Sequence, residues 1–167
     1  MHITVAPRDI LQINEARIIF RNFSGEATKF NTKGNRNFAV VIDDQELADK
    51  LEDLGWNIKV RPPRDEGDEP FMYLPVKIKF NERGPKAYLE SGSSVVHLDE
   101  ESIDCLDDID IVSADLDIRP YDWEVNGKTG RTAYLQSIRV IQEVDRFASK
   151  YGTKNDRFEE DEEGIPF

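Results

Sequence analysis

The chain has 167 residues, of which 34 are acidic and 22 basic, so its formal net charge is −12. This length favours one domain, and an apolar content of 38% is enough to form a core. No apolar run approaches the roughly 18 residues of a membrane span. One cysteine and two histidines exclude a disulfide framework and a zinc cluster, and the lone Cys105 favours a reducing cytoplasm as the location.

Strands dominate the predicted elements, taken in chain order. Residues 1–13 show no clear period and are interpreted as an arm or an edge strand. Alternation of apolar and polar residues predicts the strands that follow, at residues 16–23, 36–42, 56–60, 71–80, 87–98 (as a hairpin), 109–119, 121–125 and 132–144. Loops rich in glycine and asparagine join the first pair of strands and the last pair, so both pairs are expected to form hairpins.

Two short helices are predicted between the strands. An aspartate at position 43 or 44 can cap a helix that runs to about Leu54, where Gly55 stops it. Residues 99–106 predict a second, acidic helix. A mainly β chain with one or two short helices indicates an OB-fold-like small barrel, which we assign to residues 1–148. Residues 149–167, where the periodicity fades, are expected to form a disordered acidic tail.

Three short segments hold most of the negative charge. Residues 156–167 carry −5, residues 43–53 carry −5 and residues 99–110 carry −7, so the rest of the chain is +5. A uniformly acidic surface would repel phosphate and exclude nucleic acid as a partner. Because the charge is unevenly distributed, the net charge of −12 does not exclude DNA as a partner.

Basic and aromatic residues alternate in residues 17–38, and single-stranded DNA requires both kinds. Cations follow the phosphates, while flat rings stack on unpaired bases for roughly 1–3 kcal/mol each. Phe20 shares a strand face with Ile18 and is interpreted as core, whereas Phe23 and Phe30 are as compatible with base stacking as with burial. The basic residues taken singly fit a solvated surface, and Tyr121 and Trp123 fit hairpin packing equally well, so the prediction rests on their clustering.

We therefore predict one DNA-binding groove from two parts of the chain. Residues 17–38 contribute Arg17, Arg21, Phe23, Lys29, Phe30, Lys33 and Arg36. The later strands and the last hairpin contribute Lys59, Arg61, Tyr73, Lys77, Lys79, Tyr121, Trp123, Lys128 and Arg131, and the hairpin adds Arg119 and Tyr134. Stacking on bases does not read their edges, so the expected binding is largely independent of sequence.

The acidic tail, with Asp161, Glu162 and Glu163 near its end, closes with the apolar tip Ile165-Pro166-Phe167. This end resembles the bacterial single-stranded DNA-binding (SSB) proteins, whose acidic tail closes with Ile-Pro-Phe, although Gly164 stands where those proteins usually have an acid. The body shows no residue-by-residue match to the bacterial barrel, so a divergent, phage-type member is expected. The resemblance implies that the tip recruits replication and recombination proteins such as polymerase, helicase or primase. The residues to which it assigns this interaction are Asp161, Glu162, Glu163, Ile165, Pro166 and Phe167.

The sequence thus predicts a non-catalytic protein that binds and protects single-stranded DNA during phage replication and recombination. Neither a cofactor, a metal nor a membrane partner is expected, and the uncapped edges of a small barrel leave a homodimer open. Three alternatives remain: an acidic DNA mimic or inhibitor, an adaptor that uses only its tail, and a magnesium-dependent nuclease. The nuclease would be built on Asp104, Asp107, Asp108 and Asp110.

Overall fold

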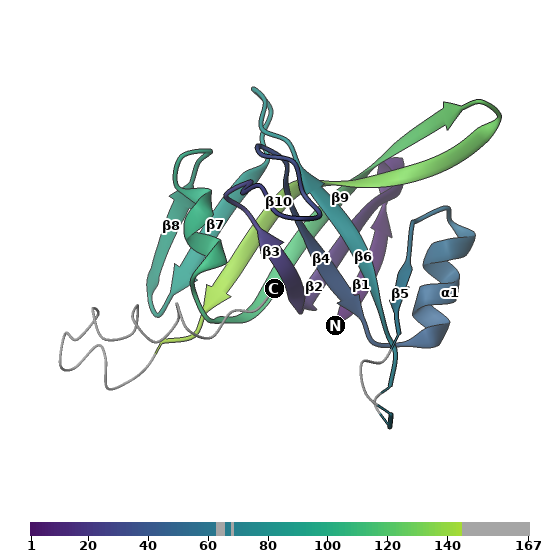
Figure 1. Cartoon of the computed structure of the whole chain (residues 1–167). Coiled ribbons are helices and arrows are strands. Elements are labelled where there is room, and N and C mark those ends of the chain that lie inside the picture. The colour runs from purple at the N-terminus through teal and green to yellow at the C-terminus, as the bar shows by residue number, and fades with distance from the viewer. Residues whose placement is uncertain (63–65, 68, 145–167) are drawn as a thin grey trace.

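The computed structural model describes residues 1–62, 66–67 and 69–144 (Figure 1). Ten strands within this part of the chain form one curved sheet in an OB-like arrangement, so the predicted mainly β fold is confirmed. The strands are β1 (His2–Ala6), β2 (Ile10–Ala16), β3 (Ile18–Asn22), β4 (Arg36–Ile42), β5 (Lys59–Arg61), β6 (Phe71–Ile78), β7 (Lys86–Ser91), β8 (Ser94–Leu98), β9 (Ile111–Val125) and β10 (Lys128–Gln142). The expected tail, its tip and the boundary at 148/149 lie outside the described residues.

Strand β10 organises the sheet, whose main path is β1-β2-β9-β10-β6-β4-β3. Along one edge β10 pairs antiparallel with β9 over nearly its whole length. Along the other edge it pairs parallel with β6 at Ala133 and Tyr134, and then parallel with β7 from Ser137 to Gln142. The short strand β5 adds to β6, and β8 adds to β7. Residues 1–13, which showed no period, supply β1 and most of β2, and β1 is the edge strand of the path.

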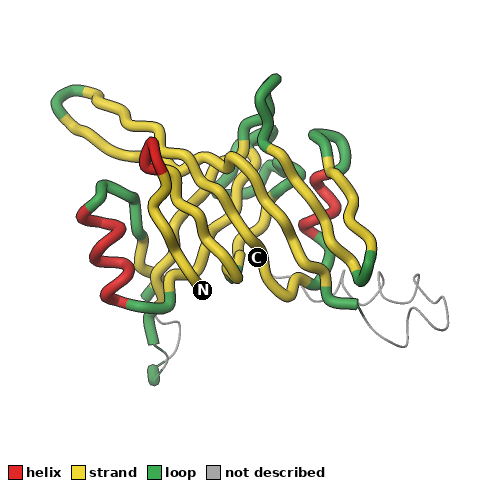
Figure 2. Tube along the Cα trace, turned by 180° about the vertical axis from the view of Figure 1, so that it is seen from behind, coloured by secondary structure: helices red, strands yellow, loops and turns green. Residues whose placement is uncertain are grey.

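The β9–β10 hairpin extends beyond the body of the sheet. Figures 1 and 2 show this hairpin and the helix α1 (Gln45–Asp53) at one end of the molecule, with the β7–β8 hairpin at the other end. The hairpin turns at Asn126 and Gly127, both of which have positive φ, as a tight hairpin turn requires. The sequence prediction of this hairpin from its glycines and asparagine is confirmed.

The two predicted helices differ in outcome. Helix α1 forms as expected, because the side chain of Asp44 accepts a hydrogen bond from Glu46 N at 3.0 Å, and its inner face buries Ala48 and Leu51. The second is a single 3₁₀ segment, η2 (Ile103–Asp107), and begins later than predicted. Asp99 instead forms a local turn by accepting hydrogen bonds from Glu101 N and Ser102 N. No helix in the described ranges is both long and apolar enough to cross a bilayer.

Strand alternation decides which side chains enter the core. In β6 the side chains of Leu74, Val76 and Ile78 are buried, whereas Tyr73 and Lys77 lie on the opposite face, as the pattern predicts. The same alternation buries Ala114, Leu116 and Ile118 in β9. The outer face of the sheet therefore carries the polar and aromatic side chains on which a function depends.

Candidate functional site

The outer face of β6 and its neighbours brings cations beside aromatic rings. The β5–β6 register pairs Lys59 with Tyr73 and Arg61 with Phe71, and residues paired in this way share a face. Across β4, the same face carries Asn37 opposite Lys77. Four of the predicted residues, Lys59, Arg61, Tyr73 and Lys77, are thus brought together by one short segment of sheet.

Phe20 completes this cluster, contrary to its prediction as a core residue. Its backbone is left-handed, with φ 53°, at a place where the β3–β4 register shifts. Such a bulge changes the direction of a side chain, so Phe20 leaves the face of Ile18. Its ring lies 5.4 Å from Tyr73, edge to face, and the Arg61 guanidinium lies 5.2 Å from its centroid. Nothing in the residue pattern marks this bulge.

A second group of rings lies along the β9–β10 hairpin. The guanidinium of Arg119 lies 4.8 Å from the ring centroid of Tyr134, and the Tyr121 and Tyr134 rings meet edge to face at 6.1 Å. Register places Tyr134 beside Lys77 of β6, which joins this group to the first one. Trp123 is directly opposite Gly130, and a Cβ placed on that glycine would overlap the indole. We call the combined rings the aromatic stripe: Phe20, Phe71, Tyr73, Tyr121, Trp123 and Tyr134.

A basic hollow adjoins the stripe at Arg119. It has a volume of about 730 Å³, and five cationic side chains line it: Arg8, Lys79, Arg83, Lys86 and Arg119. The one carboxylate in its lining, that of Asp117, accepts a hydrogen bond from Ser137 Oγ at 3.0 Å. Of the five cations, Lys79 and Arg119 are among the residues predicted to line the groove. Arg8, Arg83 and Lys86 come from separate segments, so no local run of charge indicates them.

A second hollow, of about 940 Å³, lies between the 24–35 loop, β3 and η2, and we call it the loop hollow. The stripe residues Phe20 and Tyr73 line it, together with the predicted Lys29 and Phe30. The Phe30 side chain is 92% exposed, and the Lys29 ammonium lies 5.9 Å from its ring centroid. An exposed ring beside a cation is the arrangement expected of a base-stacking site.

Phe23 and Arg21 were predicted to contact DNA; burial corrects the prediction for Phe23, while Arg21 has partners within the protein. Phe23 is fully buried and stacks on Phe38 with ring centroids 5.2 Å apart, so it offers no free ring face. Arg21 is half-buried, and its Nη1 donates hydrogen bonds to the carbonyl oxygens of Leu106 and Ile109, each at 2.7 Å. Burial lowers the pKa of Arg21, although Asp107 and other nearby acids oppose that effect. Both residues anchor the loop region to η2.

Arg36 and Arg131 also have structural partners. Arg36 Nη1 donates to the carbonyl oxygen of Phe23 at 2.8 Å. Arg131 Nε donates to an Asp122 carboxylate oxygen at 2.7 Å, and its guanidinium lies 5.2 Å from the Trp56 ring centroid. The hydrogen bond to Asp122 raises the pKa of Arg131 and lowers that of Asp122. We therefore infer that the side chains of Arg36 and Arg131 stabilise the fold.

The remaining predicted residues are exposed. Lys128 flanks the hairpin turn, and its register partner Val125 lies on the Trp123 face of the hairpin. Arg17 follows β2 and Lys33 lies in the 24–35 loop, but neither lines the two hollows described above. For Arg17 and Lys33, contact with DNA remains a prediction.

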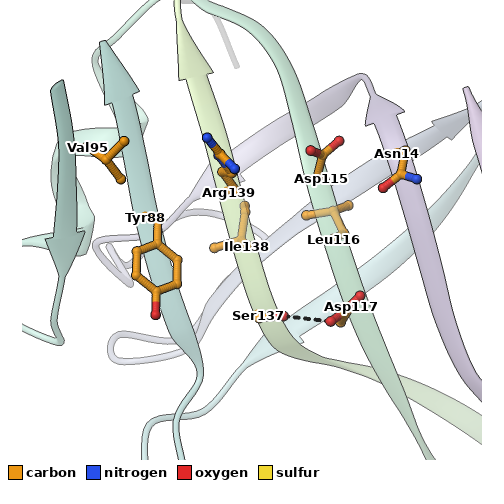
Figure 3. Close-up of a pocket in the computed structure, with 9 residues that line it drawn as sticks. All are labelled: Asn14, Tyr88, Val95, Asp115, Leu116, Asp117, Ser137, Ile138 and Arg139. Carbon is orange, nitrogen blue, oxygen red and sulfur yellow. Dashed lines mark hydrogen bonds between the residues drawn. The ribbon is translucent and has the colours of Figure 1, made fainter. Parts of the chain in front are cut away.

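The outer face changes character beyond Asp117. A hollow of about 510 Å³ lies there. Figure 3 shows the residues that line it, with the Ser137 hydroxyl pointing to Asp117 and with Asp115 on the same strand as Asp117. Arg139 in this region forms an ion pair with Glu90, with Nη2 and Oε2 2.6 Å apart. The cations described above are therefore concentrated around the stripe and the basic hollow. In the region beyond Asp117, the positive charge of Arg139 is paired with Glu90, so the basic surface ends there. Among the described residues no three His, Cys, Asp or Glu side chains are grouped so as to hold a metal ion.

Fold and site together describe an OB-like β protein whose outer face offers aromatic rings bordered by cations. A family model described as "Putative phage ssDNA-binding domain" matches residues 2–161, and the chain belongs to this family. No curated protein matches the sequence.

Solved structures of the single-stranded DNA-binding protein of bacteriophage Enc34 share the fold. Its C-terminally truncated form superposes with a TM-score of 0.53 at 11% identity, covering 84% of this chain and 90% of that one. Its complex with single-stranded DNA gives a TM-score of 0.51 at 10% identity, covering 87% and 93% of the two chains. At such low identity the likeness concerns the fold alone.

Proposed function

We propose that this protein binds single-stranded DNA along the aromatic stripe, with the phosphates held by the flanking cations. The observation that carries this proposal is the stripe itself, in which six rings lie on one outer face beside Lys59, Arg61, Lys77 and Arg119. Half-exposed rings supply faces for unpaired bases, which a duplex does not present. The family membership and the solved complex of the Enc34 protein with single-stranded DNA support the same function.

The basic hollow gives the phosphate backbone a place next to the rings. Arg119 belongs to both surfaces, because it lies over Tyr134 and also lines the hollow. When the bases of a DNA strand stack on the stripe, its phosphates would lie in the basic hollow and form ion pairs with Arg83 and Lys86. Contacts of this kind are independent of base identity and weaken as salt rises.

Binding to labelled oligo-dT across a series of salt concentrations tests this function. The full-length protein is expected to bind at low salt, with an affinity that falls linearly on a double-logarithmic plot. A matched duplex is expected to bind more weakly, since its bases are already stacked. Failure to bind oligo-dT at low salt would refute the proposal and favour the acidic DNA mimic, and cleavage that requires magnesium would favour the nuclease.

We further propose that the protein acts in phage DNA replication and recombination and that the tip at residues 161–167 recruits partner proteins. This part rests on the resemblance of the tip sequence to SSB tails. Deleting Phe167 should abolish capture of a replication protein while leaving the affinity for oligo-dT nearly unchanged. Loss of DNA binding on this deletion would contradict the role assigned to the tip.

A further inference from the structure

The loop hollow differs chemically from the rest of the proposed DNA site. Its lining combines three aromatic residues, Phe20, Phe30 and Tyr73, with carboxylates rather than with a cluster of cations. Its volume of about 940 Å³ is ample for a single nucleobase. Phe20 reaches it only through a left-handed backbone, which is rare for a bulky residue and is retained only where the surrounding structure enforces it.

Hydrogen-bond donors around this hollow are largely committed to the protein itself. Arg21 Nη1 donates to two backbone carbonyl oxygens, as described above. Asn37 Nδ2 donates to Asn31 Oδ1 at 3.0 Å, and Asn31 Nδ2 donates to the carbonyl oxygen of Glu26 at 2.9 Å. Asn22 Nδ2 donates to the same Glu26 carbonyl oxygen at 3.1 Å. These amides hold the loop in shape and are not offered to a ligand.

Acceptors, in contrast, are exposed at the rim. Glu26 and Asp104 are exposed side chains that line the hollow, and an ionised carboxylate can only accept hydrogen bonds. The neighbouring Asp107 has a structural role, since its two oxygens accept from Phe23 N at 2.7 Å and Ser24 N at 3.0 Å. The hollow thus offers rings to stack on and acceptors to bond, which suits a flat ligand with amino donors.

We propose that the loop hollow is a nucleobase subsite that prefers bases with an exocyclic amino group, cytosine above all, to uracil and thymine. This inference rests on the proposed function and adds a preference to it. A carboxylate accepts a hydrogen bond from cytosine N4, whereas it repels the O4 carbonyl that stands at this position in uracil and thymine. Phe20, Tyr73 and Phe30 supply the stacking contacts, and Lys29 at the rim faces the phosphate of the inserted nucleotide.

Oligo-dC and oligo-dU of equal length provide the test, because their bases are of equal size and differ at position 4 and in the protonation of N3. Fluorescence anisotropy at one fixed salt concentration gives both affinities for the full-length protein. One charge-assisted hydrogen bond predicts that oligo-dC binds about tenfold more tightly than oligo-dU. Equal affinities, or a preference for oligo-dU, would overturn the subsite. Failure to bind either oligonucleotide would instead overturn the proposed function.

A pair of matched double variants locates the preference. Glu26→Gln with Asp104→Asn replaces two of the three exposed carboxylates of the lining by amides, which can pair with either base, so the ratio of the two affinities should fall toward one. The third, Asp108, acts electrostatically on Arg21 and is left in place. Glu52→Gln with Asp53→Asn removes the same charge from the exposed side of α1 and should leave the ratio unchanged. An unchanged ratio in the first variant, or an equal fall in both, would refute the assignment of the preference to this hollow.

Discussion

Replacing Trp123 by leucine isolates the contribution of one ring of the stripe to DNA binding. The indole is 38% exposed, and one of its sides is covered by Gly130 across the hairpin, so a single ring face is available for a base. Stacking on a base is worth roughly 1–3 kcal/mol. With one face available we expect a loss of about 1–2 kcal/mol, which is roughly a 5- to 30-fold weaker affinity. The melting temperature should change little, because the ring packs on its own hairpin outside the core.

Anisotropy titration with oligo-dT measures this loss, and Tyr88→Leu is the matched control. Tyr88 lies on β7 with its ring 5.1 Å from that of His97, away from the stripe, so its replacement should leave the affinity unchanged. Intrinsic fluorescence offers a second readout, since Trp56 is only 3% exposed and Trp123 should account for any quenching by DNA. An unaltered affinity in Trp123→Leu, or an equal loss in the control, would refute the placement of bases on the hairpin.

Three further predictions concern the hairpin, the basic hollow and the ion pair between Asp122 and Arg131. Gly130→Ala should weaken oligo-dT binding in the same assay without removing any side chain, because the new Cβ displaces the Trp123 indole. Arg83→Gln should make the negative slope of log affinity against log salt concentration shallower by about 0.7, the value for one phosphate contact on a single strand, and an unchanged slope would contradict its role. The ion pair of Asp122 with Arg131 stabilises the fold above the ordinary pKa of an aspartate and is lost as the pH falls through the lowered pKa of Asp122. Asp122→Asn should therefore destabilise the protein at neutral pH and reduce the acid-induced loss in thermal melts, and the effect should be slight because the Asp122 carboxylate is exposed.

Strand alternation was the most reliable guide to the site. It placed Tyr73 and Lys77 on the outer face of β6 and assigned Leu74, Val76 and Ile78 to the core, and the structure agrees. Hairpin signals also located the β9–β10 turn. These features are local, because residues two apart on a strand share a face whatever the tertiary fold.

Features that depend on contacts between distant segments were not predictable. The left-handed bulge turns Phe20 outward, and the partners that hold Arg21 come from η2 and the turn after it, more than eighty residues along the chain. Phe23 is fully buried although it ends the predicted strand 16–23, next to a loop where a ring has less core to enter. The basic hollow takes Arg8 and Arg83 from separate turns. Charge counts along the sequence thus could not tell which cations have partners within the protein, as Arg21, Arg36 and Arg131 do.

Photochemical cross-linking of full-length protein to oligo-dT, mapped by mass spectrometry, tests the central claim most directly. The stripe lies on one face of the sheet, so cross-links are expected at Tyr73, Tyr121, Trp123 and Tyr134, with Phe30 at the loop hollow. High salt should abolish them together. Cross-links that instead gather at Tyr88 or around α1, with the stripe unmodified, would contradict the account.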